Sequence, residues 1–359
     1  MKNRWASLLA LVLVVSAWAA DYKVALPGYE YQFPRDHFDH PDYQTEWWYY
    51  TGNLKSPDGH RFGFELTFFR QGIARDSDPS PWHIHDLYMA HLALSDLSGR
   101  HFYHTERLNR SGPGIAGVNQ RTGMIWNGNW QAHLEDGRQQ LRAIGEEFEL
   151  NLNLKTDKPP VIHGRNGISQ KAEGVGHASH YISFTRLLTA GSIELNGTIY
   201  QVEGASWMDH EFFTESMAPG ESGWDWLGLQ LDNNTELMLY RLRHSDGSVD
   251  PYSSGTYIDA RGQASFLSAK DFTMTPSGEL STSPLSKGTY PLRWHVSIPS
   301  RGLELDIVTP LNTQELPSTI GPTYWEGAVD VTGYTGSPHG VGYLEMTGYA
   351  APHSRTVAP

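Results

Sequence analysis

The chain has 359 residues, with 40 acidic against 27 basic residues, and it contains no cysteine. This length is enough for two domains. The net charge of −13 argues against a nucleic-acid groove or an anionic lipid surface as the partner, because both need a basic face. The lack of cysteine excludes disulfides, a thiol nucleophile and a cysteine-type zinc site.

The first residues have the pattern of a cleavable export signal. Lys2 and Arg4 give a positive start, Leu8–Val15 is apolar, and Ala17-Trp18-Ala19 has the small-x-small form of a cleavage site. We therefore expect residues 1–19 to be removed and the mature protein, with a charge of −15, to be periplasmic or secreted. No later stretch is long and apolar enough to predict a transmembrane helix.

Short strand patterns dominate the remaining sequence, and convincing helical periodicity is absent from it. The predicted strands are Glu46–Leu54, Arg61–Arg70, Tyr88–Leu97, Gln140–Lys155, Ser179–Leu188, Ser192–Val202, Trp226–Leu231, Glu236–Arg243, Leu292–Ile298 and Gly340–Tyr349. Turn-forming residues separate them, as at Glu135-Asp136-Gly137 and Leu195-Asn196-Gly197. This pattern predicts an all-β chain of antiparallel sheets closed into barrels or sandwiches.

A weak internal echo suggests two related barrels. Trp47-Trp48-Tyr49-Tyr50, a turn and an apolar strand ending at Arg70 resemble Trp224-Asp225-Trp226-Leu227, a turn and an apolar strand ending at Arg241. We place an N-terminal domain at residues 20–212, a C-terminal domain at 213–350 and a disordered tail at 351–359. Two unrelated hairpins would produce the same echo, so this alternative stays open.

The segment Trp207-Met208-Asp209-His210-Glu211-Phe212 is the first candidate for chemistry. On a strand, Trp207, Asp209 and Glu211 share one face, and Met208, His210 and Phe212 share the other. A carboxyl group beside an indole is a candidate for a raised pKa, and His210 or Glu211 could orient it or return its proton. The alternative is a buried polar network that stabilises the domain junction.

Several motifs occur together in an order that resembles one family. They are Glu46-Trp47-Trp48-Tyr49, Gly63–Arg70, His163-Gly164, Tyr181-x-Ser183-x-Thr185-Arg186, Trp207–Phe212, Gly223-Trp224-Asp225-Trp226, Gln314-Glu315, Tyr324-Trp325-Glu326-Gly327 and Thr347-Gly348-Tyr349. The sequence resembles the lipocalin-like family of carotenoid 1,2-hydratase (hydroxyneurosporene synthase), which includes secreted proteins labelled predicted hydrolases. The resemblance runs from about Tyr43 to Tyr349. Fungal Diels–Alderases resemble the same fold.

The resemblance implies two lipocalin-like antiparallel β-barrel domains packed side by side, with an apolar ligand site and no cofactor. In the hydratase members a carboxylic acid protonates an isolated alkene, aromatic residues shelter the cation and water adds. Asp209 matches the position of that acid. A carotenoid enzyme works beside a pigment-bearing membrane, whereas this chain is similar to the exported branch, so the resemblance supports the fold more strongly than the activity.

Six aromatic residues are candidates for enclosing a ligand, because their rings provide apolar surface and stabilise cations. They are Trp207, Trp224, Trp226, Trp47, Trp48 and Tyr49. The alternative role for each of them is barrel core, which large aromatic side chains commonly fill.

Other chemistries find less support in the sequence. His83 and His85 would share one face of an extended segment, and His91 and His104 lie nearby in the sequence, so a metal site is conceivable. However, His83 and His85 follow a polar loop, and the sequence contains no specific metal-binding motif. We therefore expect no metal site. Ser183 and Ser206 lack the glycine elbow of a serine hydrolase. Glycoside hydrolysis would need Asp209 paired with Asp225 or Glu326.

We therefore expect an exported lipocalin-like protein that binds a small apolar ligand, of isoprenoid or lipid type, and performs cofactor-independent acid/base chemistry on it. Hydratase-type addition of water, with Asp209, His210 and Glu211 as the catalytic group, is the template. The alternatives are a non-catalytic periplasmic carrier and, with less support, a hydrolase. Membrane-associated export or transport machinery is a further candidate partner, and the sequence leaves the oligomeric state open.

Overall fold

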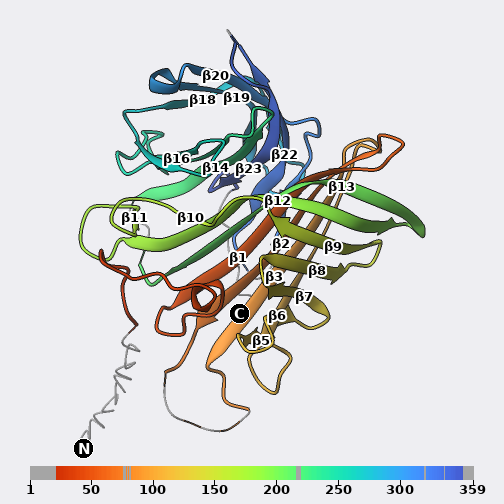
Figure 1. Cartoon of the computed structure of the whole chain (residues 1–359), viewed down its shortest axis with the longest axis vertical. Helices are drawn as coiled ribbons and strands as arrows, with labels where there is room; N and C mark the ends of the chain where they lie inside the picture. The colour runs from red at the N-terminus through yellow and green to blue at the C-terminus, as the bar shows by residue number, and fades with distance from the viewer. Residues whose placement is uncertain are drawn as a thin grey trace, which may run out of the picture.

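The structure is a computed structural model that describes residues 22–75, 78, 80, 82–215, 220–318, 321–334 and 336–350. The predicted signal and tail therefore lie outside the described residues. The described chain forms two antiparallel sheets and two short 3-10 helices, so the all-β prediction is confirmed (Figure 1). Within the described residues, no helix combines the length and the hydropathy needed to cross a membrane.

The first sheet contains thirteen strands and follows the 3-10 helix η1 (Arg35–His37). Its strands are β1 (Thr45–Lys55), β2 (Arg61–Gly72), β3 (Asp86–Asp96), β4 (His101–Arg110), β5 (Ala116–Asn119), β6 (Met124–Asn127), β7 (Trp130–Glu135), β8 (Arg138–Ile144), β9 (Phe148–Thr156), β10 (Val161–Ile162), β11 (Ser169–Gln170), β12 (Ala178–Leu195) and β13 (Thr198–Phe213).

The second sheet contains ten strands and the 3-10 helix η2 (Pro299–Arg301). Its strands are β14 (Glu221–Leu231), β15 (Glu236–His244), β16 (Ser254–Ile258), β17 (Ala264–Ser268), β18 (Thr273–Thr282), β19 (Thr289–Ile298), β20 (Leu303–Val308), β21 (Glu315–Leu316), β22 (Tyr324–Gly333) and β23 (Gly340–Thr347).

The two sheets have the same strand order. The first runs β4-β3-β2-β1-β13-β12-β9-β8-β7 and continues with β6 and β5, and the second runs β17-β16-β15-β14-β23-β22-β20-β19-β18. In each, four strands form a meander, and the last strand of the sheet pairs with the first. The equivalence therefore extends well beyond the two hairpins that produced the sequence echo, and β1 corresponds to β14 as β13 corresponds to β23.

Tight turns explain where several strands end. Asn196 (φ 49°) and Gly197 (φ 78°) join β12 to β13, and Asp136 (φ 46°) and Gly137 (φ 73°) join β7 to β8. Two consecutive positive φ angles match the right-handed twist of a hairpin, and Asn-Gly and Asp-Gly adopt them readily. The predicted strand Ser192–Val202 is therefore wrong, because the Asn196-Gly197 turn divides it between β12 and β13. The predicted strand Gln140–Lys155 is also wrong, because a turn at residues 145–147 divides it between β8 and β9. The strands within 101–135, 254–282, 303–308 and 324–333 were not predicted.

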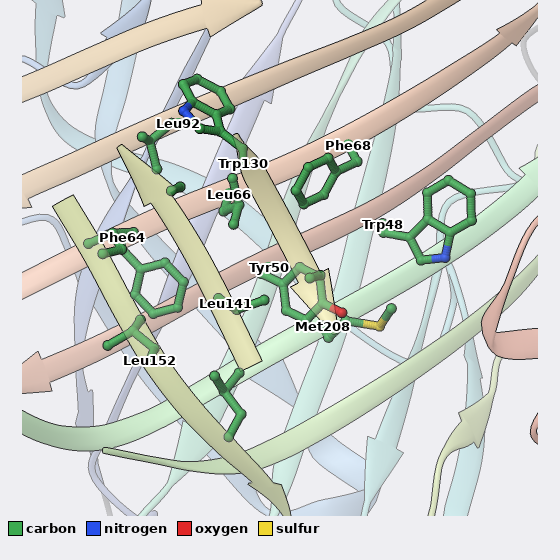
Figure 2. Close-up of a cluster of buried hydrophobic side chains, with 14 of the residues drawn as sticks. Trp48, Tyr50, Phe64, Leu66, Phe68, Leu92, Trp130, Leu141, Leu152 and Met208 are labelled. Atoms are coloured by element: carbon green, nitrogen blue, oxygen red, sulfur yellow. The ribbon is translucent and has the colours of Figure 1, made fainter. Parts of the chain in front are cut away.

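The core of the first sheet is filled by its own side chains. Trp48, Tyr50, Phe64, Leu66, Phe68, Leu92, Trp130, Leu141, Leu152 and Met208 are buried there and pack together (Figure 2). Asn127 on β6 helps to bring the ends of the sheet together, because its Nδ2 donates to the Tyr88 carbonyl (3.0 Å) and its Oδ1 accepts from Asn109 Nδ2 (2.6 Å). The sheet is thus barrel-like, with a packed interior.

The second sheet has a comparable core, and the two sheets pack through their outer faces. Leu227, Leu229, Trp294 and Trp325 belong to the second core. Between the sheets lies a separate cluster that contains Tyr49, Tyr181, Trp207, Trp226, Met238, Tyr240 and Tyr343. Strands β1, β2 and β12 of the first sheet contact β23, β22 and β14 of the second (Figure 1).

Candidate active site

A cavity of about 590 Å³ lies between the outer faces of the two sheets. Most of its lining is aromatic or aliphatic, and the remaining residues are polar or ionisable, with Arg70 and His91 among them. The lining includes Trp47, Tyr49, Phe69, Leu87, Met89, Leu108, Phe213, Trp224, Trp226, Tyr240 and Leu242, together with Lys171, Tyr181, Asp209, Glu211, Tyr324, Glu326 and Glu345. A hollow of this size and composition is typical of a small-molecule site.

Strand alternation places the carboxyl groups of β13 in this cavity. Asp209 and Glu211 point away from the first barrel's interior, whereas Met208 before them and His210 between them point into it. Side chains of a strand alternate between its two faces, which is why every second residue of the segment reaches the cavity. Tyr49 lies directly opposite Asp209 on the neighbouring strand β1 and faces the cavity too.

Asp209 is a buried carboxyl group whose direct hydrogen-bond partners are neutral. Trp207 Nε1 donates to Oδ1 (2.5 Å), the Tyr181 hydroxyl donates to Oδ2 (2.5 Å), and the Ser183 hydroxyl also donates to Oδ1. Burial raises the pKa of Asp209 to about 7, although these three donors favour the charged form. The group therefore exchanges its proton near neutral pH.

A chain of hydrogen bonds leads from Asp209 to the second sheet. His163 Nε2 lies 2.7 Å from Ser183 Oγ, and its Nδ1 lies 2.8 Å from Thr256 Oγ1. Burial, with a smaller contribution from Lys171, lowers the pKa of His163 to about 3, so the ring is neutral. A neutral imidazole both donates and accepts, so His163 can bridge Thr256 and Ser183 while the Ser183 hydroxyl donates to Asp209.

The same geometry opposes a serine nucleophile. In a serine hydrolase the histidine lies between the serine and the carboxylate, whereas here Ser183 lies between His163 and Asp209. Ser183 is fully buried and does not line the cavity. The Ser206 hydroxyl is also fully buried and pairs with Thr189 Oγ1 (2.7 Å).

Glu211 is held by a cation. Lys171 Nζ lies 3.1 Å from Glu211 Oε1, and the Ser179 hydroxyl donates to the same oxygen. Burial alone would lower the pKa of Lys171, but Glu211 and Tyr240 outweigh it and the net shift is upward, so the ammonium keeps its charge. The Lys171 ammonium also lies 4.0 Å from the centre of the Tyr240 ring.

The second sheet contributes carboxyl groups to the opposite wall. Glu326 on β22 and Glu345 on β23 line the cavity and are direct neighbours in the sheet register. Burial raises the pKa of Glu345 to about 8, with Trp224 opposing the shift and Asp209 and Glu211 adding to it. Burial also raises the pKa of Glu326 far above its ordinary range, and Glu65 of the first sheet contributes.

These residues of the second wall were largely missed by the sequence analysis. Glu326 was considered only as a partner in glycoside hydrolysis, and Glu345, Lys171 and His163 received no role. The motif around Glu326 contained the signal, since alternation places Glu326 on the same face as Tyr324. The pairing of Glu326 with Glu345 depends on the register of two strands, which the sequence does not state.

The aromatic candidates divide between three places. Trp47, Tyr49, Trp224 and Trp226 line the cavity. Trp207 lies behind Asp209 and donates to it. The prediction that Trp48 encloses a ligand is wrong, because Trp48 faces the interior of the first barrel and belongs to its core. The reason is the alternation of β1, which turns Trp48 away from the face shared by Trp47 and Tyr49.

His210 is also placed away from the cavity. It lies on the inner face of β13, and its Nε2 is 2.8 Å from Glu46 Oε1. His40 Nδ1 lies 2.7 Å from the same oxygen, and Arg70 Nε donates to Glu46 Oε2 (3.0 Å). A direct role for His210 in orienting Asp209 therefore has no contact to support it. The cluster is a buried charge network inside the first barrel.

The second barrel has an equivalent network. Asp225 on β14 pairs with Arg241 on β15 in register, and Arg241 Nη2 lies 2.8 Å from Asp225 Oδ2. Glu46 and Arg70 are paired in the same way on β1 and β2. Asp225 faces the interior of its barrel, so the suggested pairing of Asp209 with Asp225 for glycoside hydrolysis is wrong.

Among the described residues, His40, Glu46 and His210 place their ligand atoms within 4.8 Å of one another, close enough to hold a metal ion. Their surroundings oppose it, because the Arg70 guanidinium is bonded to the same carboxylate and would repel a cation. His83 and His85 lie side by side, with ring centres 4.6 Å apart, and His85 Nε2 is 3.1 Å from the Asp78 carbonyl.

The fold and the site define an all-β protein with two lipocalin-like barrels and an acid-lined apolar cavity between them. The sequence model of the AttH-like family matches residues 24–349, and the chain belongs to that family. A crystal structure described as an AttH from Nitrosomonas europaea is similar at 33% identity over 92% of this chain and 100% of that chain, with a TM-score of 0.84.

Kievitone hydratase from Nectria haematococca has the same fold at 15% identity, over 92% of this chain and 97% of that chain, with a TM-score of 0.69. No curated protein sequence matches this chain. The predicted lipocalin-like fold and the family resemblance are thus confirmed.

Proposed function

We propose that the protein binds an apolar, alkene-bearing molecule in the cavity between the barrels and adds water to it, with Asp209 as the acid. One observation carries this proposal. Asp209 is a buried carboxyl group at an aromatic cavity, bonded to neutral donors, and its pKa is raised to about 7. Such a group is protonated often enough at neutral pH to donate a proton, and it regains that proton readily.

The proposed reaction balances without a cofactor. The Asp209 proton and the alkene π electrons form a new C–H bond, which leaves a cation on the adjacent carbon. A water oxygen then bonds to that carbon, and the proton released from the water returns to the Asp209 carboxylate. The Tyr181 and Trp207 donors stabilise the carboxylate during the interval, and the ring faces of Trp47 and Trp226 stabilise the cation.

The cavity volume of about 590 Å³ is suited to a short isoprenoid chain or a prenylated ring. Both barrel interiors are filled by their own side chains, which favours the space between the barrels as the ligand site. The kievitone hydratase likeness supports the fold only, at 15% identity. Export, inferred from the Lys2–Ala19 pattern, belongs to the same proposal.

The test is turnover of neutral prenyl compounds, such as geraniol and a prenylated phenol, in water labelled with oxygen-18. Mass spectrometry would detect the gain of one labelled water. Asp209→Asn should lower the rate by at least about 100-fold, because the acid is lost. Tryptophan fluorescence should show that this variant still binds the ligand.

Asp136→Asn is the matched control, since Asp136 is exposed in the turn between β7 and β8. The wild-type rate should fall as the pH rises above about 7, where Asp209 loses its proton. An Asp209→Asn variant as active as the wild type would refute the proposal. Tight binding of the prenyl compounds with no turnover by either protein would favour the carrier function instead.

A further inference from the structure

The second wall of the cavity carries two acids in direct opposition. Glu326 and Glu345 are register partners on adjacent antiparallel strands, and both project to the cavity side of the sheet. Side chains at such positions have Cβ atoms about 5 Å apart, and like charges there repel. The two carboxyl groups therefore cannot both ionise without a cation, and at neutral pH the pair keeps at least one proton.

The first sheet shows how such an acid is normally compensated. Glu345 is the register partner of Trp226, and Glu211 is the register partner of Trp47, at equivalent places in the two repeats. Glu211 has the Lys171 ammonium at 3.1 Å. Within the described part of the second sheet, no lysine or arginine forms an ion pair with Glu326 or Glu345. The repeat thus keeps the acid and lacks its counter-ion.

The Glu326 carboxyl group in this wall is also poorly satisfied by hydrogen bonds. Glu326 is fully buried, and neither of its carboxyl oxygens has a hydrogen-bond partner of normal geometry in the described chain. The buried hydroxyl of Tyr49 on β1 lies next to this carboxyl group and interacts with it, but the two do not reach the geometry of a normal hydrogen bond. Tyr49 is therefore the only partner that Glu326 has among the described residues, and it is neutral, so no positive charge within the described residues balances the ionised form of this carboxyl group.

Aromatic rings surround the same wall. The Tyr49 and Trp226 rings pack edge to face with centres 5.4 Å apart, and both line the cavity together with Trp224 and Tyr324. Carboxyl groups among aromatic faces are complementary to a cation with an apolar shell, because both kinds of group attract positive charge and the rings exclude water.

We propose that Glu326 and Glu345 form a subsite that binds a positively charged centre within an apolar ligand. The proposal rests on the proposed function only in placing the ligand in this cavity. The positive charge could come from either of two groups: a permanent ammonium group of the ligand, or the carbocation that protonation by Asp209 would create. In either case one carboxyl group of the pair is ionised opposite the charge, and its proton leaves to solvent.

A matched pair of probes tests this subsite without a known substrate. Benzyltrimethylammonium and neopentylbenzene have nearly the same shape and differ in charge. We expect the ammonium probe to bind the wild-type protein at least about tenfold more tightly than its carbon isostere, as measured by tryptophan fluorescence. Calorimetry in two buffers of different ionisation enthalpy should show release of about one proton when the ammonium probe binds.

The double variant Glu326→Gln/Glu345→Gln should lose this preference, so that the isostere binds at least as tightly as the ammonium probe. Glu135→Gln, exposed at the end of β7, is the control and should keep the wild-type preference. Equal binding of the two probes to the wild type, or an unchanged preference in the double variant, would overturn the proposal. If the double variant does not fold, the probe preference of the single variant Glu345→Gln and the proton release by the wild type test the proposal in its place.

Turnover separates the two sources of charge. Loss of alkene hydration in the double variant, with binding of the neutral isostere retained, would assign the subsite to the carbocation. A wild-type protein that prefers the ammonium probe but hydrates no alkene would assign it to a permanently charged ligand. That second result would refute the proposed function and leave the subsite in place.

Discussion

Replacing Glu65 with glutamine should make the protein more stable at alkaline pH than the wild type. Glu65 lies on β2 and faces the second sheet, and its side chain is fully buried. The Thr67 hydroxyl donates to Oε1, and Oε2 has no hydrogen-bond partner in the described chain. Burial raises the pKa of Glu65 to about 8, so the residue is neutral at pH 7 and glutamine reproduces that form.

The sign and the size of the effect follow from the two pKa values. Below pH 4.5, the ordinary value, the folded and unfolded chains both hold the proton, so the group contributes nothing. Between 4.5 and about 8 only the folded chain holds it, so stability falls as the pH rises, and the loss is complete above about 8. The gap of about 3.5 pKa units sets an upper limit of about 5 kcal/mol. Water entry on ionisation reduces this, and we expect about 2–3 kcal/mol.

The assay is urea unfolding at pH 6 and pH 9, followed by tryptophan fluorescence and circular dichroism together, because two barrels can unfold in separate steps. The free energy of unfolding should fall less between the two pH values in Glu65→Gln than in the wild type. Part of the loss has already occurred at pH 6, so about 1–2 kcal/mol of it falls between the two pH values. With a slope of about 3 kcal/mol per molar urea, this corresponds to a midpoint shift of about 0.5 M. Glu135→Gln should behave as the wild type. Equal losses in Glu65→Gln and the wild type would refute the reasoning.

Two further substitutions test how the cavity walls are held. Lys171→Met should destabilise the protein by about 3–5 kcal/mol, because it leaves Glu211 buried without its cation. In thermal denaturation, adding Glu211→Gln should recover part of this loss. An unchanged melting temperature in Lys171→Met would contradict a stabilising ion pair. Gly63→Ala should cost about 1–3 kcal/mol, because a Cβ on Gly63 would lie 2.8 Å from the Ala328 Cβ across the two sheets. The double variant Gly63→Ala/Ala328→Gly should restore the urea midpoint of the wild type. If its midpoint is no higher than that of Gly63→Ala, contact between these two Cβ atoms is not the cause of the destabilisation.

Local signals in the sequence were sufficient for the class of fold and for one wall of the site. Strand alternation separated Asp209 from His210 correctly, because that separation depends only on the geometry of a single strand. The Asn196-Gly197 and Asp136-Gly137 turns were recognisable for a similar reason, since their backbone conformation is a property of two adjacent residues. The role suggested for His210 beside Asp209 ignored that same alternation.

The sequence by itself determined that this is an all-β chain with an acid beside an indole on one strand face. Only the tertiary structure decided what that face meets. Two outer sheet faces close around Asp209, and burial between them, not the neighbouring indole alone, raises the pKa of Asp209 to about 7. The register of β22 and β23 brings Glu326 beside Glu345, although the two residues lie in separate motifs. Register and packing between sheets join residues that are distant in the chain, and no local pattern encodes which ones will meet.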